Sequence, residues 1–354
     1  MTITFSVATR LEGVVLEGGW VVKARRAMPP DRTPANFSVG YEVENVSGEK
    51  AFLKAIDYYE ALSSENASVK VGEVSQSFNA ESDLLFRCRD RKLSKIVRPI
   101  ASGEYREPNS DPRDVVSYVI FELADGDARD LVNEVDAKDQ LRMLRLCRDA
   151  TVALSQLHSI EVSHQDVKGA NLLIFKSLTG PNGKLGDLGR AHQPGRPTPH
   201  DDLIFACHES DAAPEQVYRM ENPLPEDQRR RASDLHMLGS LICFLLVNIP
   251  YTGYFALNRP KSLAPNNLSG QFEEVLPGLI DTHITILQKL EMALDRSYAD
   301  AVLKILNELC HPDPRVRGSQ EAISRGQNRL NLQGYASRLD LIYKRALAAQ
   351  HRFN

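Results

Sequence analysis

The stretch His164-Gln165-Asp166-Val167-Lys168-Gly169-Ala170-Asn171 decides how the rest of this 354-residue chain is interpreted. An apolar run, Leu172-Leu173-Ile174-Phe175, follows it directly, and Asp187-Leu188-Gly189 comes sixteen residues after Asn171. Such a short apolar run predicts a buried strand. The plainest interpretation is a polar loop between a helix and this strand. The alternative is a functional loop, because acidic, basic and amide side chains recur at a fixed spacing.

The order and spacing of these residues resemble the protein-kinase catalytic loop, H-R-D-x-x-x-x-N, followed by D-F-G. The resemblance implies that Asp166 orients or deprotonates an acceptor hydroxyl and that Lys168 neutralises the transferring phosphoryl group. Asn171 and Asp187 offer oxygen ligands, which suit Mg²⁺. Phosphoryl transfer depends on positioning and charge neutralisation more than on covalent chemistry, so these residue types fit that reaction.

The composition is that of an ordinary globular protein, with 42% hydrophobic and 25% charged residues. The length allows one large domain or two. The net charge of −4 gives no indication of nucleic acid or of an anionic membrane as a partner. The five cysteines are scattered and odd in number. We therefore expect free thiols in a reducing compartment, and neither a disulfide framework nor a zinc site.

The N-terminus lacks the basic and apolar regions of a signal peptide. The longest apolar run, Leu241 to Val247, is far too short to cross a bilayer. These features predict a cytoplasmic protein without a membrane partner or a nucleic-acid partner. They do not specify its oligomeric state.

The first third of the chain is rich in β-branched and aromatic residues between turn formers. Strands are expected over residues 11–16, 20–22, 37–46, 51–56, 96–100 and 115–123. Lys54 lies among apolar residues of the fourth range, where burying a lysine is costly unless it is paired. It could instead lie on a solvated strand face. The resemblance makes it the lysine that holds the α- and β-phosphates of the nucleotide.

A lysine in that role needs a carboxylate partner. Apolar residues follow Glu81 three and four positions later, which is a helical spacing. Kinases place their helix glutamate here, so the resemblance favours Glu81. A polar stretch, Ser63 to Gln76, separates it from Lys54 and leaves Glu60, Glu65 and Glu73 as rival partners.

Residues 119–126 resemble the kinase hinge, whose backbone binds the edge of adenine. A plain edge strand leading into a turn is the alternative. The resemblance implies that Phe121 is the gatekeeper and that Leu173 forms the floor of the adenine pocket. Contacts with ATP are implied for Val39, Lys54, Glu81, Phe121, Glu122, Leu123, Ala124, Leu173 and Asp187. Asn182-Gly183 is expected to form the turn between two strands.

The remainder of the chain is predominantly helical in pattern. Apolar residues recur at 3.6-residue spacing from Asp139 to His158, which predicts a helix. A second apolar helix is expected through Val247, with Ser233 or Asp234 as its cap. The resemblance implies that Asp234 accepts hydrogen bonds from the catalytic-loop backbone. Further helices are expected at about 273–291, 296–310 and 334–350.

Two later motifs extend the resemblance. Ala213-Pro214-Glu215 matches the kinase A-P-E, and residues 311–317 resemble a late D-P-x-x-R. The resemblance implies a buried ion pair between Glu215 and Arg317, where exposed loop charges are the alternative. Histidines and a cysteine precede this motif at spacings that fit no standard zinc site: His192, His200, Cys207 and His208.

The loop that covers the phosphates departs from the family. Counting back from Lys54 places it at residues 28–36, which contain no glycine and three prolines. Glycine lets backbone amides approach phosphate, and proline lacks the amide. Arg32 could supply a positive charge instead. A second alignment uses Glu17-Gly18-Gly19-Trp20, which has the glycines but leaves a long insertion before Lys54.

Other departures concern single positions. Phe52 stands where the family has a small alanine above adenine, so it narrows the pocket unless the strand is shifted. Gln165 replaces an arginine that pairs with a phosphorylated activation loop, which implies activity without that phosphorylation. Leu188 replaces a phenylalanine and is still apolar. Residues 207–212 lack the usual Gly-Thr pair, which leaves the acceptor specificity open.

The sequence therefore predicts an α+β, two-lobed kinase fold. A small antiparallel β lobe with one helix and an N-terminal extension spans residues 1–123. A mainly helical lobe spans residues 124–320, and a helical tail, 321–354, packs on it or follows it. The resemblance implies ATP- and Mg²⁺-dependent transfer of the γ-phosphoryl group to serine or threonine of protein substrates, the chain itself included. A pseudokinase and a small-molecule phosphotransferase are the alternatives.

Overall fold

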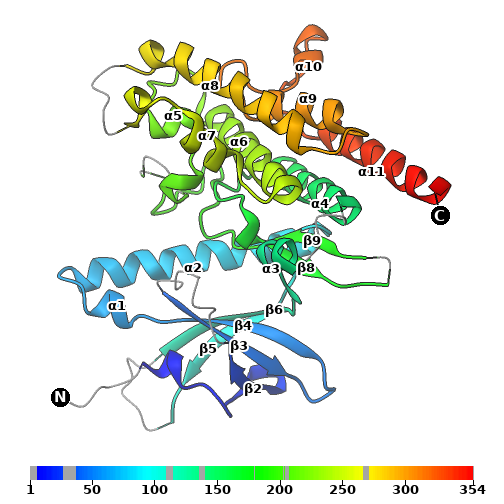
Figure 1. The fold of residues 1–354 in the computed structure, drawn as a ribbon. Helices are drawn as coiled ribbons and strands as arrows, with labels where there is room; N and C mark the ends of the chain where they lie inside the picture. The colour runs from blue at the N-terminus through cyan, green and yellow to red at the C-terminus, as the bar shows by residue number, and fades with distance from the viewer. Residues whose placement is uncertain are drawn as a thin grey trace. The chain divides into compact units, whose positions relative to one another are not determined.

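The computed structural model describes residues 6–26, 37–108, 115–134, 140–178, 180–201, 203, 207–265 and 271–353. The chain divides into two compact units, residues 1–92 with 96–124 and residues 93–95 with 125–354. Figure 1 traces both from the N-terminus to the C-terminus. The lobe boundary expected after residue 123 lies one residue from this division.

The first unit is built on one antiparallel sheet of strand order β1-β2-β3-β4-β6-β5. Its strands are β1 (Val15–Leu16), β2 (Trp20–Arg25), β3 (Ser38–Glu44), β4 (Lys50–Ile56), β5 (Pro99–Arg106) and β6 (Val115–Glu122). Its helices are η1 (Val7–Thr9), η2 (Glu17–Gly19), α1 (Tyr59–Leu62) and α2 (Ala67–Asp90). The mainly helical second unit completes the expected α+β fold class.

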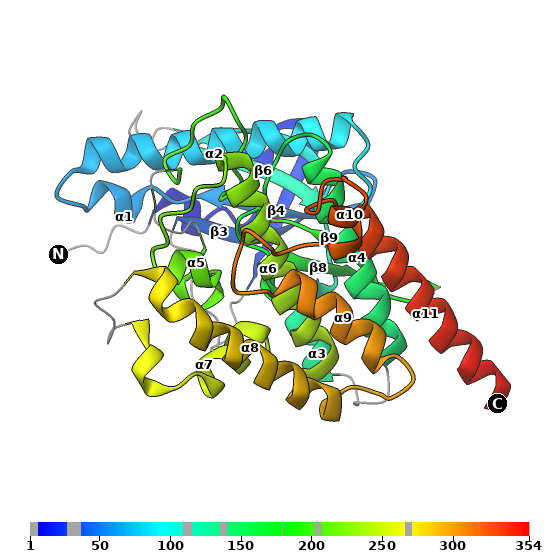
Figure 2. The same ribbon diagram turned by 90° about the horizontal axis from the view of Figure 1, so that it is seen from above.

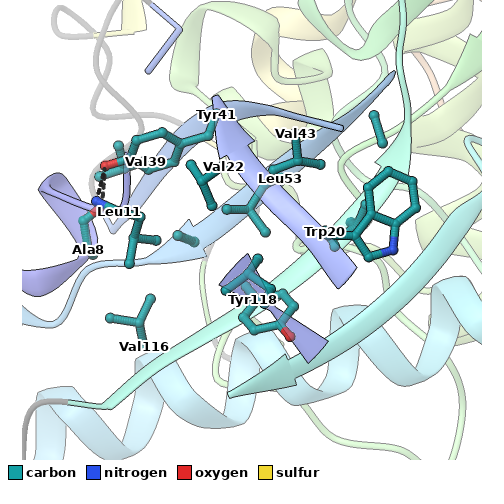
Figure 3. Close-up of a cluster of buried hydrophobic side chains, with 14 of the residues drawn as sticks. Ala8, Leu11, Trp20, Val22, Val39, Tyr41, Val43, Leu53, Val116 and Tyr118 are labelled. Carbon is teal, nitrogen blue, oxygen red and sulfur yellow. Dashed lines mark hydrogen bonds between the residues drawn. The ribbon is translucent and has the colours of Figure 1, made fainter. Parts of the chain in front are cut away.

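Side chains alternate between the two faces of this sheet, as strand geometry requires. One face carries the hydrophobic core, in which alternate residues of β3, β4 and β6 pack beneath the N-terminal segment. Figure 3 shows Ala8 and Leu11 of that segment beside Tyr41 and Leu53. The N-terminal extension is therefore part of the core of this unit.

The Tyr41 side chain fastens the extension to the sheet. Its ring is fully buried, and its hydroxyl donates to the Ala8 carbonyl at 2.7 Å (Figure 3). The same oxygen accepts from the Leu11 amide at 3.5 Å. Burial raises the pKa of this phenol above its ordinary value, so it remains protonated and able to donate.

Helix α2 begins earlier than the sequence suggested. It starts at Ala67, so it contains most of the polar stretch expected between Lys54 and Glu81. The helix was hard to predict there because its first half buries little. Its inner face follows helical spacing with Val74, Phe78, Glu81, Leu84, Leu85 and Cys88.

The second unit is mostly helical and carries a small sheet of order β7-β8-β9 (Figures 1 and 2). Its strands are β7 (Gly126–Asp127), β8 (Leu172–Phe175) and β9 (Asn182–Leu185). Its longer helices are α3 (Ala128–Glu134), α4 (Gln140–His158), α6 (Glu226–Val247), α7 (Tyr251–Asn258), α8 (Phe272–Ala293), α9 (Ala299–Leu309) and α11 (Gln333–Phe353). Its short helices are η3 (Gly169–Asn171), η4 (Glu209–Asp211), α5 (Pro214–Val217), η5 (Lys261–Leu263) and α10 (Gln320–Ser324). The helices expected from periodicity are thus present as α4, α8, α9 and α11.

Two local predictions in this unit were wrong. Helix α6 begins at Glu226 after Pro225, so Ser233 and Asp234 lie inside it and do not cap it. The polar first two turns hid its start, because apolar periodicity appears only after Ala232. Asn182-Gly183 belongs to β9 and pairs with β8, so the chain reverses before Asn182 and not at it. Asn-Gly is a common turn signal, but here the strand pairing overrides it.

The C-terminal tail is packed on the helical unit. Helices α11 and α4 are in contact, and Arg148 of α4 pairs with Asp340 of α11 at 3.0 Å. Arg338 pairs with the buried Glu308 of α9 at 2.6 Å. Of the two arrangements expected for this tail, packing on the lobe is the one observed.

All five cysteines are free and buried, as the sequence suggested. Among the described residues, no single helix is long and apolar enough to span a membrane. Helices α6 and α7 are long and apolar enough only when they are taken together, and a bend of 90° separates them.

A buried ion pair joins α5 to the loop before α10. Arg317 is fully buried and donates from Nη1 and Nη2 to the two carboxylate oxygens of Glu215, each at 2.7 Å. Arg317 Nη1 also donates to the Ala232 carbonyl in α6 at 2.9 Å. This confirms the predicted pair. Such a bidentate contact fixes both geometry and charge.

We expect Arg317→Met to lower the free energy of unfolding by about 3–5 kcal/mol, because it leaves the Glu215 carboxylate buried without its counter-charge. The measurement is chemical denaturation followed by circular dichroism. Arg325→Met is the matched control, since Arg325 pairs with Glu321 on the exposed surface, where such pairs contribute little. Equal losses in the two variants would contradict the structural role of Arg317.

Candidate active site

In the sheet unit, Lys54 of β4 forms an ion pair with Glu81 of α2. Lys54 Nζ lies 2.8 Å and 3.0 Å from the two carboxylate oxygens. The lysine side chain is 23% exposed and the glutamate side chain 9%. The predicted pair is therefore present. Of the rivals, Glu73 pairs with Lys70, and Glu60 and Glu65 are exposed.

The alternation of β4 explains where Lys54 points. Ala51, Leu53 and Ala55 enter the core cluster, so the residue between Leu53 and Ala55 faces the other side of the sheet. There a partly buried ammonium needs a partner, and helix α2 presents Glu81 on its buried face. The sequence thus places a paired cation between apolar neighbours in β4.

Phe52 lies on the same sheet face as Lys54, two residues away. Its ring is accommodated by Gly40, where an added Cβ would come within 2.8 Å of the ring. The ring of Phe121, directly opposite in β6, lies 6.5 Å away between centroids. No register irregularity separates β4 from β3 or β6. The strand is therefore not shifted, and the bulky ring stays on the face of the lysine.

The prediction for Val39 was wrong. Val39 lies in the core cluster beneath the N-terminal segment (Figure 3), on the face opposite to Lys54. Gly40 is the residue paired with Lys54 in the register of β3 and β4. A one-residue difference in register exchanges the two faces of a strand. Val39 was chosen from the sequence, whereas the residue on the Lys54 face is its neighbour Gly40.

The remaining sheet-unit candidates lie at the end of β6. Phe121 is buried on the Lys54 face. Glu122 exchanges backbone and side-chain hydrogen bonds with Arg98, at 3.1 Å and 2.8 Å. Leu123 and the buried Ala124 follow the strand. The preferred phosphate-loop residues, 28–36 with Arg32, lie outside the described residues. The alternative, Glu17-Gly18-Gly19, forms η2 ahead of β2.

In the helical unit, Asp234 holds the backbone of the catalytic loop. Its Oδ2 accepts from the His164 amide at 2.9 Å, and its Oδ1 accepts from the Gln165 amide at 2.8 Å. The role implied for Asp234 is confirmed. Burial alone would raise the pKa of Asp234, but hydrogen bonds from His158 and from Gln165 hold it below its ordinary value. The carboxylate is therefore charged.

The Asp166 side chain is held between Lys168 and Asn171. Lys168 Nζ lies 3.0 Å from Oδ1 and 2.9 Å from Oδ2. The Asn171 amide nitrogen donates to Asp166 Oδ2 at 3.0 Å and to its backbone carbonyl at 2.8 Å. The three predicted catalytic residues are thus assembled in one network, with Asp166 and Asn171 buried and Lys168 partly exposed.

Asp187 and Asp211 add negative charge around Lys168. Burial alone would lower the pKa of Lys168, but the charges of Asp166, Asp211 and Asp187 outweigh burial and raise it. Asp187 is exposed and adopts a left-handed backbone conformation with φ of 55°. Such a conformation is uncommon outside glycine and marks a position fixed by its surroundings. Leu173, the expected pocket floor, lies half-buried in β8, and Leu188 is buried.

Gln165 has a structural partner in place of a phosphate. Its side-chain nitrogen donates to the Arg230 carbonyl at 2.8 Å and to Asp234 Oδ1 at 2.9 Å. The residue itself has a left-handed φ of 63°. Its amide therefore binds helix α6 and does not reach toward the segment that follows Asp187.

That segment, residues 187–213, is held by an aspartate. Asp201 accepts from His192 Nδ1 at 2.8 Å and from the Thr198 amide at 2.7 Å, and its carbonyl accepts from Arg230 at 2.9 Å. Burial alone would raise the pKa of Asp201, but the hydrogen bonds from His192 and Thr198 hold it below its ordinary value. Arg190 binds His200 at 2.8 Å.

The histidines of this segment have individual partners. His192 binds Asp201, His200 binds Arg190, and His208 binds Ser210. In the part of the chain that the structure describes, no group of three or more histidine, cysteine or acidic side chains could hold a metal ion.

Sequence reasoning missed Gly40, Asp201 and Asp211. No motif marks the two aspartates: Asp201 binds His192 and Thr198 within its own segment, and Asp211 acts on Lys168, which is distant in the chain. The signal for Gly40 was available, since a glycine two residues from a bulky aromatic across a strand pair can indicate close packing.

Comparison with known proteins gives one family match. A family model described as a protein kinase domain matches residues 37–327, which include the Lys54–Glu81 pair of the sheet unit and the Asp166 network of the helical unit.

Individual relatives cover smaller parts. "Serine/threonine-protein kinase 1" of Arabidopsis thaliana is 26% identical over 174 residues, 47% of this chain and 19% of the relative. "Serine/threonine-protein kinase/endoribonuclease IRE1a" of the same plant is 23% identical over 177 residues, 50% of this chain and 18% of the relative. "Serine/threonine-protein kinase/endoribonuclease IRE1" of Oryza sativa subsp. japonica is 28% identical over 123 residues, 34% of this chain and 13% of the relative. The matched part therefore spans less than a fifth of each relative.

Proposed function

This chain belongs to the protein kinase family and is similar to serine/threonine kinases, and we propose that it is an active ATP- and Mg²⁺-dependent one. It would transfer the γ-phosphoryl group to serine or threonine hydroxyls of protein substrates, with the chain itself as a candidate substrate. The observation that carries this proposal is the arrangement of Asp166, Lys168 and Asn171 in one hydrogen-bonded network. A protein that has lost catalysis has no need to keep these three side chains in register.

The network fits the acceptor side of the reaction. The Asp166 carboxylate, paired with Lys168, can accept the proton of a substrate hydroxyl. The hydroxyl oxygen then bonds to phosphorus as the bond between that phosphorus and the leaving phosphate oxygen breaks. Lys168 offers the positive charge that a transferring phosphoryl group needs. Asp234 positions the loop, because it binds the two successive amides directly before Asp166.

The residues present also fit a magnesium nucleotide. The Asn171 amide nitrogen is taken by Asp166, which leaves its carbonyl oxygen to face a cation. The exposed Asp187 supplies a charged oxygen. Magnesium prefers such oxygen ligands, and when bound it neutralises developing phosphate charge. Lys54, held by Glu81, offers an ammonium group for the nucleotide phosphates.

The alternatives have less support. A pseudokinase explains the glycine-poor loop and Phe52, but not the intact catalytic network. A small-molecule phosphotransferase does not need the buried Glu215–Arg317 pair, which supports α5 and the segment before it. The endoribonuclease part of two relatives' names is not extended to this chain, since the matches cover 18% and 13% of those proteins. Five free, buried cysteines support the proposal of a reducing, cytoplasmic location.

We expect Asp166→Asn and Asp187→Ala each to abolish phosphoryl transfer while leaving the fold intact. Asn lacks the charge that accepts the proton, and alanine removes a metal ligand from an exposed position. The measurement is incorporation of labelled phosphate into the chain and into a panel of protein substrates. Thermal unfolding of both variants controls for stability. Turnover at the wild-type rate in either variant would disprove the assignment.

The Phe52 ring is expected to restrict nucleotide binding. Phe52→Ala should lower KM for ATP, because it removes the ring from the Lys54 face. Gly40→Ala should raise KM, because its new Cβ meets that ring at 2.8 Å and pushes it outward. In the Phe52→Ala background, Gly40→Ala should have no effect. Additive changes across the four proteins would contradict the contact between the two positions.

The segment 187–213 is expected to support activity without phosphorylation. Asp201 already binds His192 and the Thr198 amide, so a carboxylate provides the order that a phosphate provides elsewhere. Gln165 lacks a charge and binds α6. We propose that the unphosphorylated protein is the active form.

We expect Asp201→Ala to lower the initial rate at least about tenfold, equivalent to about 1.4 kcal/mol in the barrier. The double variant Thr198→Ala/Ser210→Ala and a phosphatase-treated sample should stay near the wild-type rate. Gln165→Arg should not raise it. A tenfold fall in the double variant or after phosphatase treatment would show that phosphorylation switches the enzyme.

A further inference from the structure

A pocket of about 360 Å³ lies in the helical unit, and none of its lining residues belongs to the Asp166 network. It is lined by residues of η4, α5, α6 and α7, and these last three helices are drawn side by side in Figures 1 and 2. Pro214, Val217 and Phe255 give it apolar walls. This volume is at the lower end of those that bind small organic molecules.

Among the residues that line the pocket, His236 is unusual because it is a buried polar side chain without hydrogen bonds to the part of the chain that the structure describes. It lies in the middle of α6 and is 1% exposed, yet both ring nitrogens lack a hydrogen-bond partner among the described residues. Burial, with the charges of Arg317 and His283, lowers its pKa well below the ordinary value, so the ring is neutral. A neutral imidazole presents one donor and one acceptor. Leaving both unpaired in the interior is costly.

The neighbours of His236 do not satisfy it. Tyr251 meets its ring edge-on at 5.8 Å between centroids, but the Tyr251 hydroxyl is hydrogen-bonded to His283 Nδ1. Thr252 also lines the pocket, and its amide and hydroxyl contact Ser240. The groups that could complete His236 must therefore come from the contents of the pocket.

Arg259 supplies a positive charge at the same pocket. It is half-buried at the end of α7 and lies near the Tyr218 hydroxyl, whose own hydrogen bond goes to the Leu263 carbonyl at 2.7 Å. Among the described residues no carboxylate forms an ion pair with Arg259. A guanidinium in that position matches a planar carboxylate.

We propose that this pocket binds a small aromatic carboxylate that carries a hydroxyl group. The carboxylate pairs with Arg259, the ring packs between Pro214, Val217 and Phe255, and the hydroxyl gives His236 its missing hydrogen bond. The volume accepts a single ring and its substituents. The proposal goes beyond the proposed phosphoryl transfer, because none of its residues belongs to the Asp166 network.

Such a ligand would also contact the η4 turn, which lies next to the catalytic Lys168. The pocket is closed on one side by Ala212 and by the exposed residues 208–210. Asp211, inside the same η4 turn, is close enough to Lys168 to affect its charge. A bound ligand therefore stabilises the turn that carries Asp211 toward the catalytic lysine.

The test is isothermal titration of the full chain with 4-hydroxyphenylacetate as the probe. We expect saturable one-to-one binding with Kd below about 1 mM, which is reasonable for a ligand of this size. Phenylacetate lacks the hydroxyl, and 4-hydroxyphenylethanol lacks the carboxylate. Each should bind at least about tenfold more weakly than the probe.

Variants assign the two contacts. His236→Phe should remove the preference for the probe over phenylacetate, and Arg259→Gln should remove the preference over 4-hydroxyphenylethanol. Arg219→Gln is the matched control, since Arg219 is exposed and is not part of the lining. Backbone amides between residues 207 and 218 should exchange hydrogen more slowly in the complex.

Three outcomes would overturn the proposal. They are no saturable binding to the folded wild-type chain, equal binding of all three compounds, and preferences that survive in His236→Phe and Arg259→Gln. The first would mean that water alone completes His236. The ligand comparison uses only the wild-type chain, so it remains decisive if a variant fails to fold. It needs no phosphoryl transfer and is therefore independent of the proposed function.

Discussion

The hydrogen bonds to the buried carboxylate of Asp234 determine where the catalytic loop of the helical unit lies. Asp234 lies within α6, fully buried, and accepts from two successive loop amides, from the Gln165 side chain and from His158 Nε2 at 2.8 Å. Hydrogen bonds to a charged acceptor are stronger than neutral ones. In the interior, this strength replaces the solvation that the carboxylate has lost. The position of Asp166 follows, since it comes directly after the two bound amides.

The same turn of α6 holds a second element. The Ala232 carbonyl accepts from Arg317 at 2.9 Å, and Arg317 binds Glu215 of α5. The catalytic loop and the end of the segment 187–213 are thus both fixed to a stretch of α6 only a few residues long. Every residue from Ala232 to Cys243 is buried. A helix that is buried on all sides cannot rotate when one of these contacts is altered. The catalytic loop and the Glu215–Arg317 pair are therefore held by the same rigid part of α6.

Much of this arrangement could be predicted, because motifs report chemistry that needs fixed spacing. Asp166, Lys168 and Asn171 lie within one loop, so their assembly follows from local geometry. The Lys54–Glu81 and Glu215–Arg317 pairs were also predicted, although each joins distant segments, because the resemblance to kinases identifies both partners. For Lys54, the cost of an unpaired lysine among apolar residues also indicated that a partner is needed.

The errors arose where the relevant information is not local. Val39 was placed on the wrong face because strand register depends on the partner strand. The start of α6 was missed because its first two turns are polar. The partners of Gln165 lie in α6, far away in the chain, and no spacing rule encodes them. The partners of Asp201 are local, but no known motif marks them. The glycine at position 40 is explained only by the ring of Phe52, which the sequence presents as a separate departure.

Gln165 and Asp201 together replace the usual pair of an arginine and a phosphate in the segment after Asp187. A phosphate carries about −1.5 to −2 charges and needs an arginine to hold it. A carboxylate carries a single charge, and here His192 and one backbone amide are enough to hold Asp201. In the unphosphorylated active form that we propose, no phosphate has to be bound, so position 165 does not need a cation. Its neutral amide can instead bind Asp234 and the Arg230 carbonyl. Arg230 in turn donates to the Asp201 carbonyl, so one short part of α6 connects the catalytic loop to the segment that a phosphate would otherwise have to order.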